Sequence, residues 1–256
     1  MSPTVVRDGV PIVFDDLGSG LPVVVLIHGW SCDRGYWAAQ IPALHGRRVV
    51  NVDLGGHGES GCNRSDWSMA AFAADVVAVV DHLQLSDLVL VGHSMGGNVA
   101  LEAARRLPGR VRGLIWADVY RQLSGHRNAE QVNERLKPLQ SRYVEETQRF
   151  VRGLFPAGAD AALVERVAHG MSSAPPTIAL AALAATWHYE RGAAQVVREL
   201  GLPIVAIVPD EAHDLASMQA CGVQVMTLPN IGHFPMMEDP PAFNALLLRA
   251  LQRFAR

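Results

Sequence analysis

The stretch from Val89 to Ala100 limits what this chain can fold into more than any other part of the sequence. A short apolar, β-branched run ends at Gly92, and an Ala- and Leu-rich helical pattern follows Gly-x-Ser94-x-Gly. A strand that reverses sharply into a helix strains its apical residue, so the positions two before and two after it must lack side chains. A Gly-rich turn that happens to hold a serine is the alternative. The flanking strand and helix favour a nucleophile above a helix N-terminus, where negative charge is stabilised.

Strand and helix patterns alternate on both sides of this turn. The two segments around the Asp8-Gly9 turn predict a hairpin, and the apolar run 23–27 reads as an interior parallel strand. Further strands are expected at 48–52, 88–91, 111–117, 203–208 and 223–228. Helices are expected at 68–85, from the Ser94 turn to residue 107, at 210–221, and from Pro240 onward. This alternation predicts an α/β fold with a doubly wound, mostly parallel β-sheet.

The strand signal disappears between residues 119 and 200. Helical patterns at 130–139, 143–154, 161–169 and 178–186 are separated by Pro-containing breaks. We therefore expect a core made of residues 1–118 and 201–256, with residues 119–200 inserted as a helical cap.

Composition excludes several classes of function. The 256-residue chain has a net charge of −3 and no basic stripe, which argues against nucleic-acid binding. It has no apolar run long enough to span a membrane, and its first residues lack the pattern of a signal peptide. The widely spaced Cys32, Cys62 and Cys221 are typical of reduced thiols, not of disulfides or a metal site. We expect a cytoplasmic protein that binds neither membrane nor metal.

A serine nucleophile needs a base, and His233 is the best candidate among ten histidines. It lies in a loop after the last strand, at the edge of the sheet where ligands bind in open α/β folds. His93 is expected to pack beneath the Ser94 turn, and His28 to shape the loop after its strand. His57, in a Gly-rich loop, is expected to be a structural hydrogen-bonder.

Three motifs together resemble the α/β-hydrolase fold family. They are His28-Gly29-Trp30, Gly92-His-Ser-Met-Gly96, and Gly232-His233 followed by Glu238-x-Pro240, in the order that the family shows. The resemblance covers nearly the whole chain, with residues 119–200 as the variable cap. It implies an oxyanion hole formed by the N–H groups of Met95 and Trp30, and it requires no cofactor. We expect His28, Gly29, His93 and Trp187 to contact the substrate.

The acid of the expected triad has two candidates. Most members of the family carry it after the strand that is here 203–208, usually in a Gly-x-x-Asp loop, but the loop at Asp210 lacks that glycine. A minority carry it at the end of the preceding strand, where Asp118 stands. We prefer Asp118 because the end of a strand is a dependable place for a site residue, whereas Asp210 is also placed to cap a helix.

These features predict a serine hydrolase that cleaves a carboxylic ester or lactone of a small, apolar substrate. Aromatic residues such as Trp30 and Trp187 favour an apolar substrate, although such residues commonly belong to the core. Cofactor-free oxygenation or C–C bond hydrolysis with the same triad is one alternative, and a ligand-binding protein on a hydrolase scaffold is another. We expect no macromolecular partner beyond a second copy, so the chain is a monomer or a homodimer.

Overall fold

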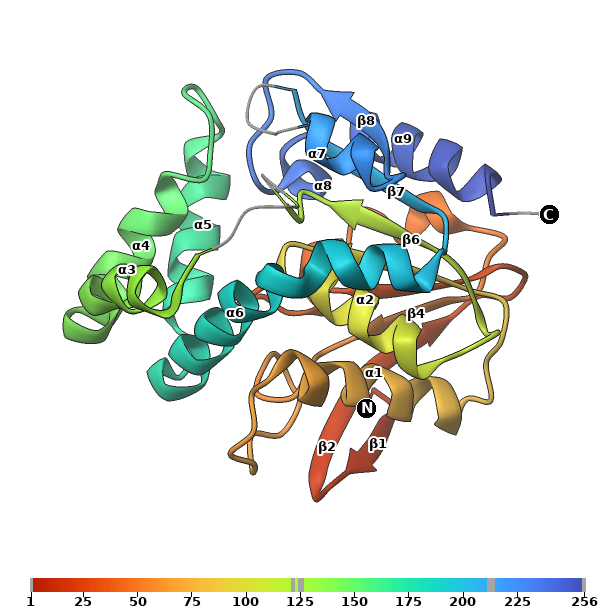
Figure 1. The fold of residues 1–256 in the computed structure, drawn as a ribbon, viewed down its shortest axis with the longest axis horizontal. Coiled ribbons are helices and arrows are strands. Elements are labelled where there is room, and N and C mark those ends of the chain that lie inside the picture. Colours follow the sequence, from red (N-terminus) through yellow and green to blue (C-terminus); the bar gives the residue numbers. More distant parts are fainter. Residues whose placement is uncertain (1, 121–122, 124–126, 211–214, 255–256) are drawn as a thin grey trace.

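The computed structural model describes residues 2–120, 123, 127–210 and 215–254. Its centre is an eight-stranded sheet with strand order β1-β2-β4-β3-β5-β6-β7-β8 (Figure 1). The strands are β1 (Thr4–Arg7), β2 (Val10–Leu17), β3 (Val23–Ile27), β4 (Val49–Val52), β5 (Leu88–His93), β6 (Val111–Ala117), β7 (Ile204–Pro209) and β8 (Gln224–Leu228). The first two strands pair antiparallel to their neighbours, and all the others pair parallel. The expected mostly parallel α/β sheet is confirmed.

Helices cover the sheet and extend beyond it. They are α1 (Met69–His82), α2 (Met95–Arg106), α3 (Ala129–Ser141), α4 (Tyr143–Arg152), α5 (Ala161–Ser172), α6 (Pro176–Leu200), α7 (Leu215–Ala220), α8 (Pro235–Glu238) and α9 (Pro240–Gln252), with short 3-10 turns η1 (Arg34–Trp37) and η2 (Pro42–Leu44). Helices α1, α2 and α6 lie side by side in front of the sheet in Figure 1, and α9 packs on β7 and β8.

Local sequence explains where these elements begin. Ser68 caps α1 by accepting a hydrogen bond from the N–H of Ala71, and Asp239 caps α9 in the same way through Ala242. Strand β3 and strand β5 are buried along their whole length. Such continuous burial is typical of interior parallel strands, and it places the turn after β5 at the middle of the sheet.

Residues after β6 leave the sheet and form a separate helical layer. Helices α3, α4 and α5 lie to one side of the sheet, on the left in Figure 1, and α6 returns the chain to β7. Helix α6 packs against both α3 and α2, so one continuous helix joins this layer to the sheet.

Most helices differ from their expected bounds by a few residues, and α6 and α7 differ most. Helix α6 continues from residue 186 to Leu200 because no proline interrupts it before Gly201, which ends the helix in a left-handed conformation with φ 59°. Helix α7 begins at Leu215, and residues 211–214 of the expected helix lie outside the described residues. Within the described ranges, no helix combines the length and apolar character needed to cross a bilayer.

Candidate active site

Ser94 occupies a strained turn between β5 and α2. Its backbone has φ 51° and ψ −121°, a combination that non-glycine residues rarely adopt. A Cβ at Gly92 would overlap the carbonyl of Gly96, and a Cβ at Gly96 would overlap that of Ile27. Both glycines are therefore required by close backbone contacts, as the sequence spacing predicted.

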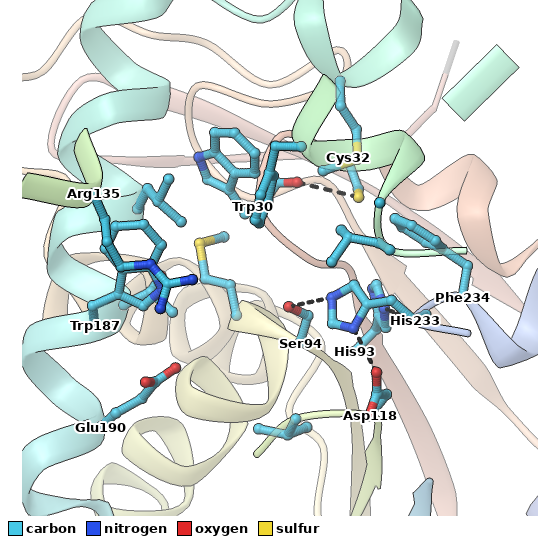
Figure 2. Close-up of a pocket in the computed structure, with 18 of the residues that line it drawn as sticks. Trp30, Cys32, His93, Ser94, Asp118, Arg135, Trp187, Glu190, His233 and Phe234 are labelled. Atoms are coloured by element: carbon cyan, nitrogen blue, oxygen red, sulfur yellow. Dashed lines mark hydrogen bonds and ion pairs between the residues drawn. The ribbon is translucent and has the colours of Figure 1, made fainter. Parts of the chain in front are cut away.

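His233 connects Ser94 to a carboxylate. Its Nε2 lies 3.0 Å from Ser94 Oγ, and its Nδ1 lies 2.5 Å from Asp118 Oδ2 (Figure 2). A carboxylate only accepts, so Nδ1–H donates to Asp118 and Nε2 is left to accept the hydroxyl proton of Ser94. This is the arrangement that general-base activation of a serine requires.

The backbone directs Asp118 toward His233. Asp118 directly follows β6, its φ is 47°, and its N–H donates to the carbonyl of Ile207 on β7. Asp118 is buried, with 4% of its surface exposed to solvent. The other candidate, Asp210, is exposed, and among the described residues no hydrogen bond joins it to His233.

Three hydrogen bonds, to Leu154 and to Glu238, hold the loop that carries His233. The N–H of His233 donates to the carbonyl of Leu154, in the segment between α4 and α5. The carboxylate of Glu238 accepts from the N–H groups of Gly232 and Phe234, at 2.9 and 2.8 Å. Burial raises the pKa of Glu238, while these two donors oppose the rise.

His93 supports the same loop from below. It is buried, and its Nε2–H donates to the carbonyl of His233 at 2.7 Å. Burial, together with repulsion from His233, lowers the pKa of His93 to about 3. The ring is therefore neutral at ordinary pH. His93 also lines the cavity described below.

Met95 and Trp30, the residues predicted to form an oxyanion hole, line the same cavity as Ser94. Met95 is the first residue of α2, and Trp30 follows β3. In the described part of the chain, neither backbone N–H donates to a protein acceptor. Unpaired N–H groups at a helix start and a loop can stabilise an oxyanion.

His28 and Gly29 do not line the cavity, contrary to the expectation that they contact the substrate. His28 is fully buried: its Nε2 accepts from the N–H of Leu54 at 3.0 Å and its Nδ1–H donates to the carbonyl of Gly29 at 2.8 Å. A Cβ at Gly29 would lie 2.7 Å from His93 Nδ1. Both residues thus shape the loop that presents Trp30.

A cavity of about 790 Å³ opens at Ser94 and extends under the helical layer. Met95, Phe150 and Leu183 contribute apolar side chains to its wall. Trp187, predicted to contact the substrate, lines the cavity across from Ser94, as Figure 2 shows. The volume is typical of a small-molecule site.

Sequence reasoning missed the contacts between the helical layer and the site. The indole N–H of Trp30 donates to the carbonyl of Ala179 on α6 at 2.7 Å. Leu154 holds His233, and Phe155 stacks on Phe234 with ring centres 5.0 Å apart. No local pattern signals such contacts, because each joins residues far apart in the sequence.

Comparison with known proteins gives consistent matches. A family sequence model described as the alpha/beta hydrolase fold matches residues 22–161, more than half of the chain. A non-heme haloperoxidase from Rhodococcus erythropolis is 44% identical over 107 residues, covering 41% of this chain and 39% of that protein. The matched part of this chain spans less than half the length of the curated relatives.

Solved structures match over almost the whole chain. A thermophilic esterase from Thermogutta terrifontis has a TM-score of 0.84 and 26% identity, covering 100% of this chain and 98% of that chain. An AqdC variant in complex with its substrate, described for recognition and ring cleavage of the Pseudomonas quinolone signal, has a TM-score of 0.82 and 26% identity. That match covers 98% of this chain and 99% of the AqdC chain.

Proposed function

This chain belongs to the alpha/beta hydrolase fold family, and we propose that it is a serine hydrolase that cleaves a carboxylic ester or lactone through an acyl-enzyme. One observation carries the proposal: the imidazole of His233 lies between Ser94 Oγ and Asp118 Oδ2, within hydrogen-bond distance of both. The 26% identical esterase structure, aligned over nearly the full length of both chains, supports the same reaction class.

In the proposed reaction, His233 Nε2 takes the proton of Ser94 as its Oγ attacks the substrate carbonyl. Asp118 holds the imidazole in the required tautomer and stabilises the imidazolium that forms. The tetrahedral oxyanion rests on the N–H groups of Met95 and Trp30. His233 then gives its proton to the departing alkoxide, and a water molecule activated by His233 hydrolyses the acyl-enzyme.

We assign residues 119–200 the role of a cap that selects the substrate. These residues supply Phe150, Leu183 and Trp187 to the cavity wall, and such side chains favour an acyl group with apolar character. The site needs no cofactor for this chemistry, because the serine, the base and the N–H donors supply nucleophile, proton transfer and charge stabilisation.

Hydrolysis of a p-nitrophenyl acyl ester tests the proposal. We expect rapid release of nitrophenol that disappears in Ser94→Ala, and covalent labelling of the Ser94 peptide by a fluorophosphonate, identified by mass. Release that persists in Ser94→Ala, or labelling of another residue, would refute the acyl-enzyme mechanism. Binding of such compounds without turnover would favour a ligand-binding protein.

The second candidate is cofactor-free oxygenation or C–C cleavage of an aromatic ketone. The similarity to the ring-cleaving AqdC variant favours it specifically. In that reaction His233 and Asp118 would remove a substrate proton, and Ser94 would only hydrogen-bond to the substrate. Oxygen uptake with a hydroxyquinolone, retained in part by Ser94→Ala, would support this candidate over the hydrolase.

A further inference from the structure

The backbone of His233 is hydrogen-bonded both to the helical layer and to the sheet. Its N–H donates to the carbonyl of Leu154 at 2.9 Å, and its carbonyl accepts from His93 at 2.7 Å. His93 ends β5, whereas Leu154 lies between α4 and α5 in residues 153–156, which we call the α4–α5 turn. The proposed base is therefore held in part by residues that lie outside the sheet.

An aromatic contact joins the α4–α5 turn to the imidazole of His233. The ring of Phe155 stacks on that of Phe234, with centres 5.0 Å apart and planes 21° apart. Phe234 is fully buried, and its ring meets the imidazole edge-on at 5.2 Å; Figure 2 shows the two side by side. Among the described residues Phe234 lines the cavity and Phe155 does not. Phe155 thus contacts the loop of the base without belonging to the substrate wall.

The α4–α5 turn approaches this loop as closely as a glycine allows. A Cβ on Gly232 would lie 2.5 Å from the Leu154 carbonyl oxygen, 2.8 Å from Pro156 Cδ and 3.0 Å from Phe155 Cα. All three atoms belong to the turn. In packing this tight, a displacement of the turn also displaces the loop.

The turn is itself fixed to its helices. The N–H of Leu154 donates to the carbonyl of Val151 at 3.0 Å. Helix α4 packs against α5, and Arg152 on α4 pairs with Glu165 on α5 at 2.7 Å. A turn anchored in this way can support the loop that leans on it.

We propose that Phe155 is a positioning residue for the base: through Phe234 it keeps His233 at the distance from Ser94 that proton transfer requires. Nε2 and Oγ are 3.0 Å apart, within the range of roughly 2.6–3.2 Å that a general base needs. A displacement of about 1 Å can cost about 10²-fold in rate. The inference rests on the proposed hydrolase function, and it gives residues 119–200 a part in turnover as well as in substrate choice.

Replacement of Phe155 separates kcat from KM. In Phe155→Ala we expect kcat for p-nitrophenyl acetate to fall by roughly three- to tenfold, the factor that corresponds to one stacked aromatic pair. KM should change little because the Phe155 ring does not line the cavity. Phe155→Tyr keeps the ring and should retain most of the wild-type kcat.

Leu163→Ala is the matched control. Leu163 is buried in α5 of the same helical layer and does not line the cavity. Its truncation should destabilise the protein at least as much as Phe155→Ala, as urea denaturation measures, because a buried leucine leaves a cavity. It should leave kcat unchanged, since Leu163 makes no contact through which the loop of His233 is held.

Gly232→Ala tests the close approach without removing any contact. The φ of Gly232 is not in the left-handed region, so alanine fits its backbone and meets only the turn. We expect kcat to fall by about 10²-fold. Gly170→Ala in α5 is its control, because the nearest atom to a Cβ there is Tyr36 Oη at 3.5 Å, an ordinary contact.

A spectroscopic measurement reports on the base without any substrate. The low-field proton resonance of His233 Nδ1–H should broaden at a lower temperature in Phe155→Ala than in the wild type or in Leu163→Ala, because a loosened loop admits water to this hydrogen bond. The inference is overturned if Phe155→Ala keeps the wild-type kcat and resonance, or if Leu163→Ala loses as much kcat. Failure of the hydrolase proposal looks different: nitrophenol release would persist in Ser94→Ala, and the resonance would still test the position of His233.

Discussion

His233 Nδ1 lies 2.5 Å from Asp118 Oδ2 although the two residues are 115 positions apart. Asp118 leaves the end of β6 and His233 follows β8, while β7 lies between these strands in the sheet. The acid therefore reaches the base across an intervening strand. Asp210, at the end of that intervening strand, is exposed. This geometry makes Asp118 the proposed third member of the triad.

Replacing the two candidate acids separately tests this assignment. Asp118→Asn should lower kcat for ester hydrolysis by roughly 10³- to 10⁴-fold, because an amide no longer holds His233 in the tautomer that accepts the Ser94 proton. Asp210→Asn should retain nearly full activity. Steady-state kinetics with a p-nitrophenyl ester measures both. Full turnover in Asp118→Asn would remove that residue from the mechanism.

Trp30→Phe tests whether the bond from Trp30 to Ala179 positions the oxyanion hole. The backbone N–H of residue 30 is kept, but the indole donor that ties its loop to α6 is lost. We expect kcat to fall by about tenfold with little change in KM, because the oxyanion exists only in the transition state.

Trp37→Phe is the matched control for that variant. Trp37 is fully buried, and its indole N–H has no partner in the described part of the structure. The kcat of Trp37→Phe should stay close to that of the wild type. A change in KM alone in Trp30→Phe would mean that the bond shapes substrate binding and not the oxyanion hole.

Gly96→Ala should prevent the Ser94 turn from forming. The added Cβ would overlap the carbonyls of Ile27 and His28, and backbone atoms cannot move aside as a flexible side chain can. We expect the free energy of unfolding to fall by roughly 3 kcal/mol or more, measured by urea denaturation.

Gly192→Ala should change the free energy of unfolding in the opposite direction. Gly192 lies exposed in α6, and an added Cβ there meets nothing within 4 Å. Alanine should stabilise the protein by about 0.5–1 kcal/mol, the usual gain for this change in a helix. Equal effects at the two positions would contradict the account of the turn.

Acid should destabilise the fold through its buried neutral histidines. Burial, with repulsion from His28, lowers the pKa of His57 to about 3, while the unfolded chain has a value of about 6.5. The unfolded state thus binds more protons. The contribution of His57 to the free energy of unfolding is therefore full above pH 6.5 and is lost as the pH falls toward 3. Between pH 7 and pH 5 it amounts to roughly 2 kcal/mol.

His57→Gln should remove that contribution. Lowering the pH from 7 to 5 should reduce the free energy of unfolding of this variant by about 2 kcal/mol less than it reduces that of the wild type. Denaturant titration at each pH measures both. His45→Gln, which replaces an exposed histidine, is the control variant. An unchanged slope in His57→Gln would show that His57 is not the group that titrates.

The sequence predicted secondary-structure elements well where a pattern of a few neighbouring residues determines them. Strand β6 has the predicted bounds, and the glycines around Ser94 are needed for the reason that their spacing indicated. The end of α6 was predicted too early because apolar periodicity fades in its second half. That half remains helical because nothing breaks it before Gly201.

The amino-acid sequence by itself determined the order of strands and helices, the strained turn at Ser94 and the family to which the chain belongs. Backbone sterics and side-chain periodicity act over a few residues, so these features can be predicted from the sequence alone. Only the tertiary structure decided that Asp118 and not Asp210 contacts His233, and that His28 and Gly29 lie behind the cavity wall. It also decided that Trp30 is bonded to α6. Each of these depends on where loops from distant strands meet, which is set by the packing of the whole sheet and its helices.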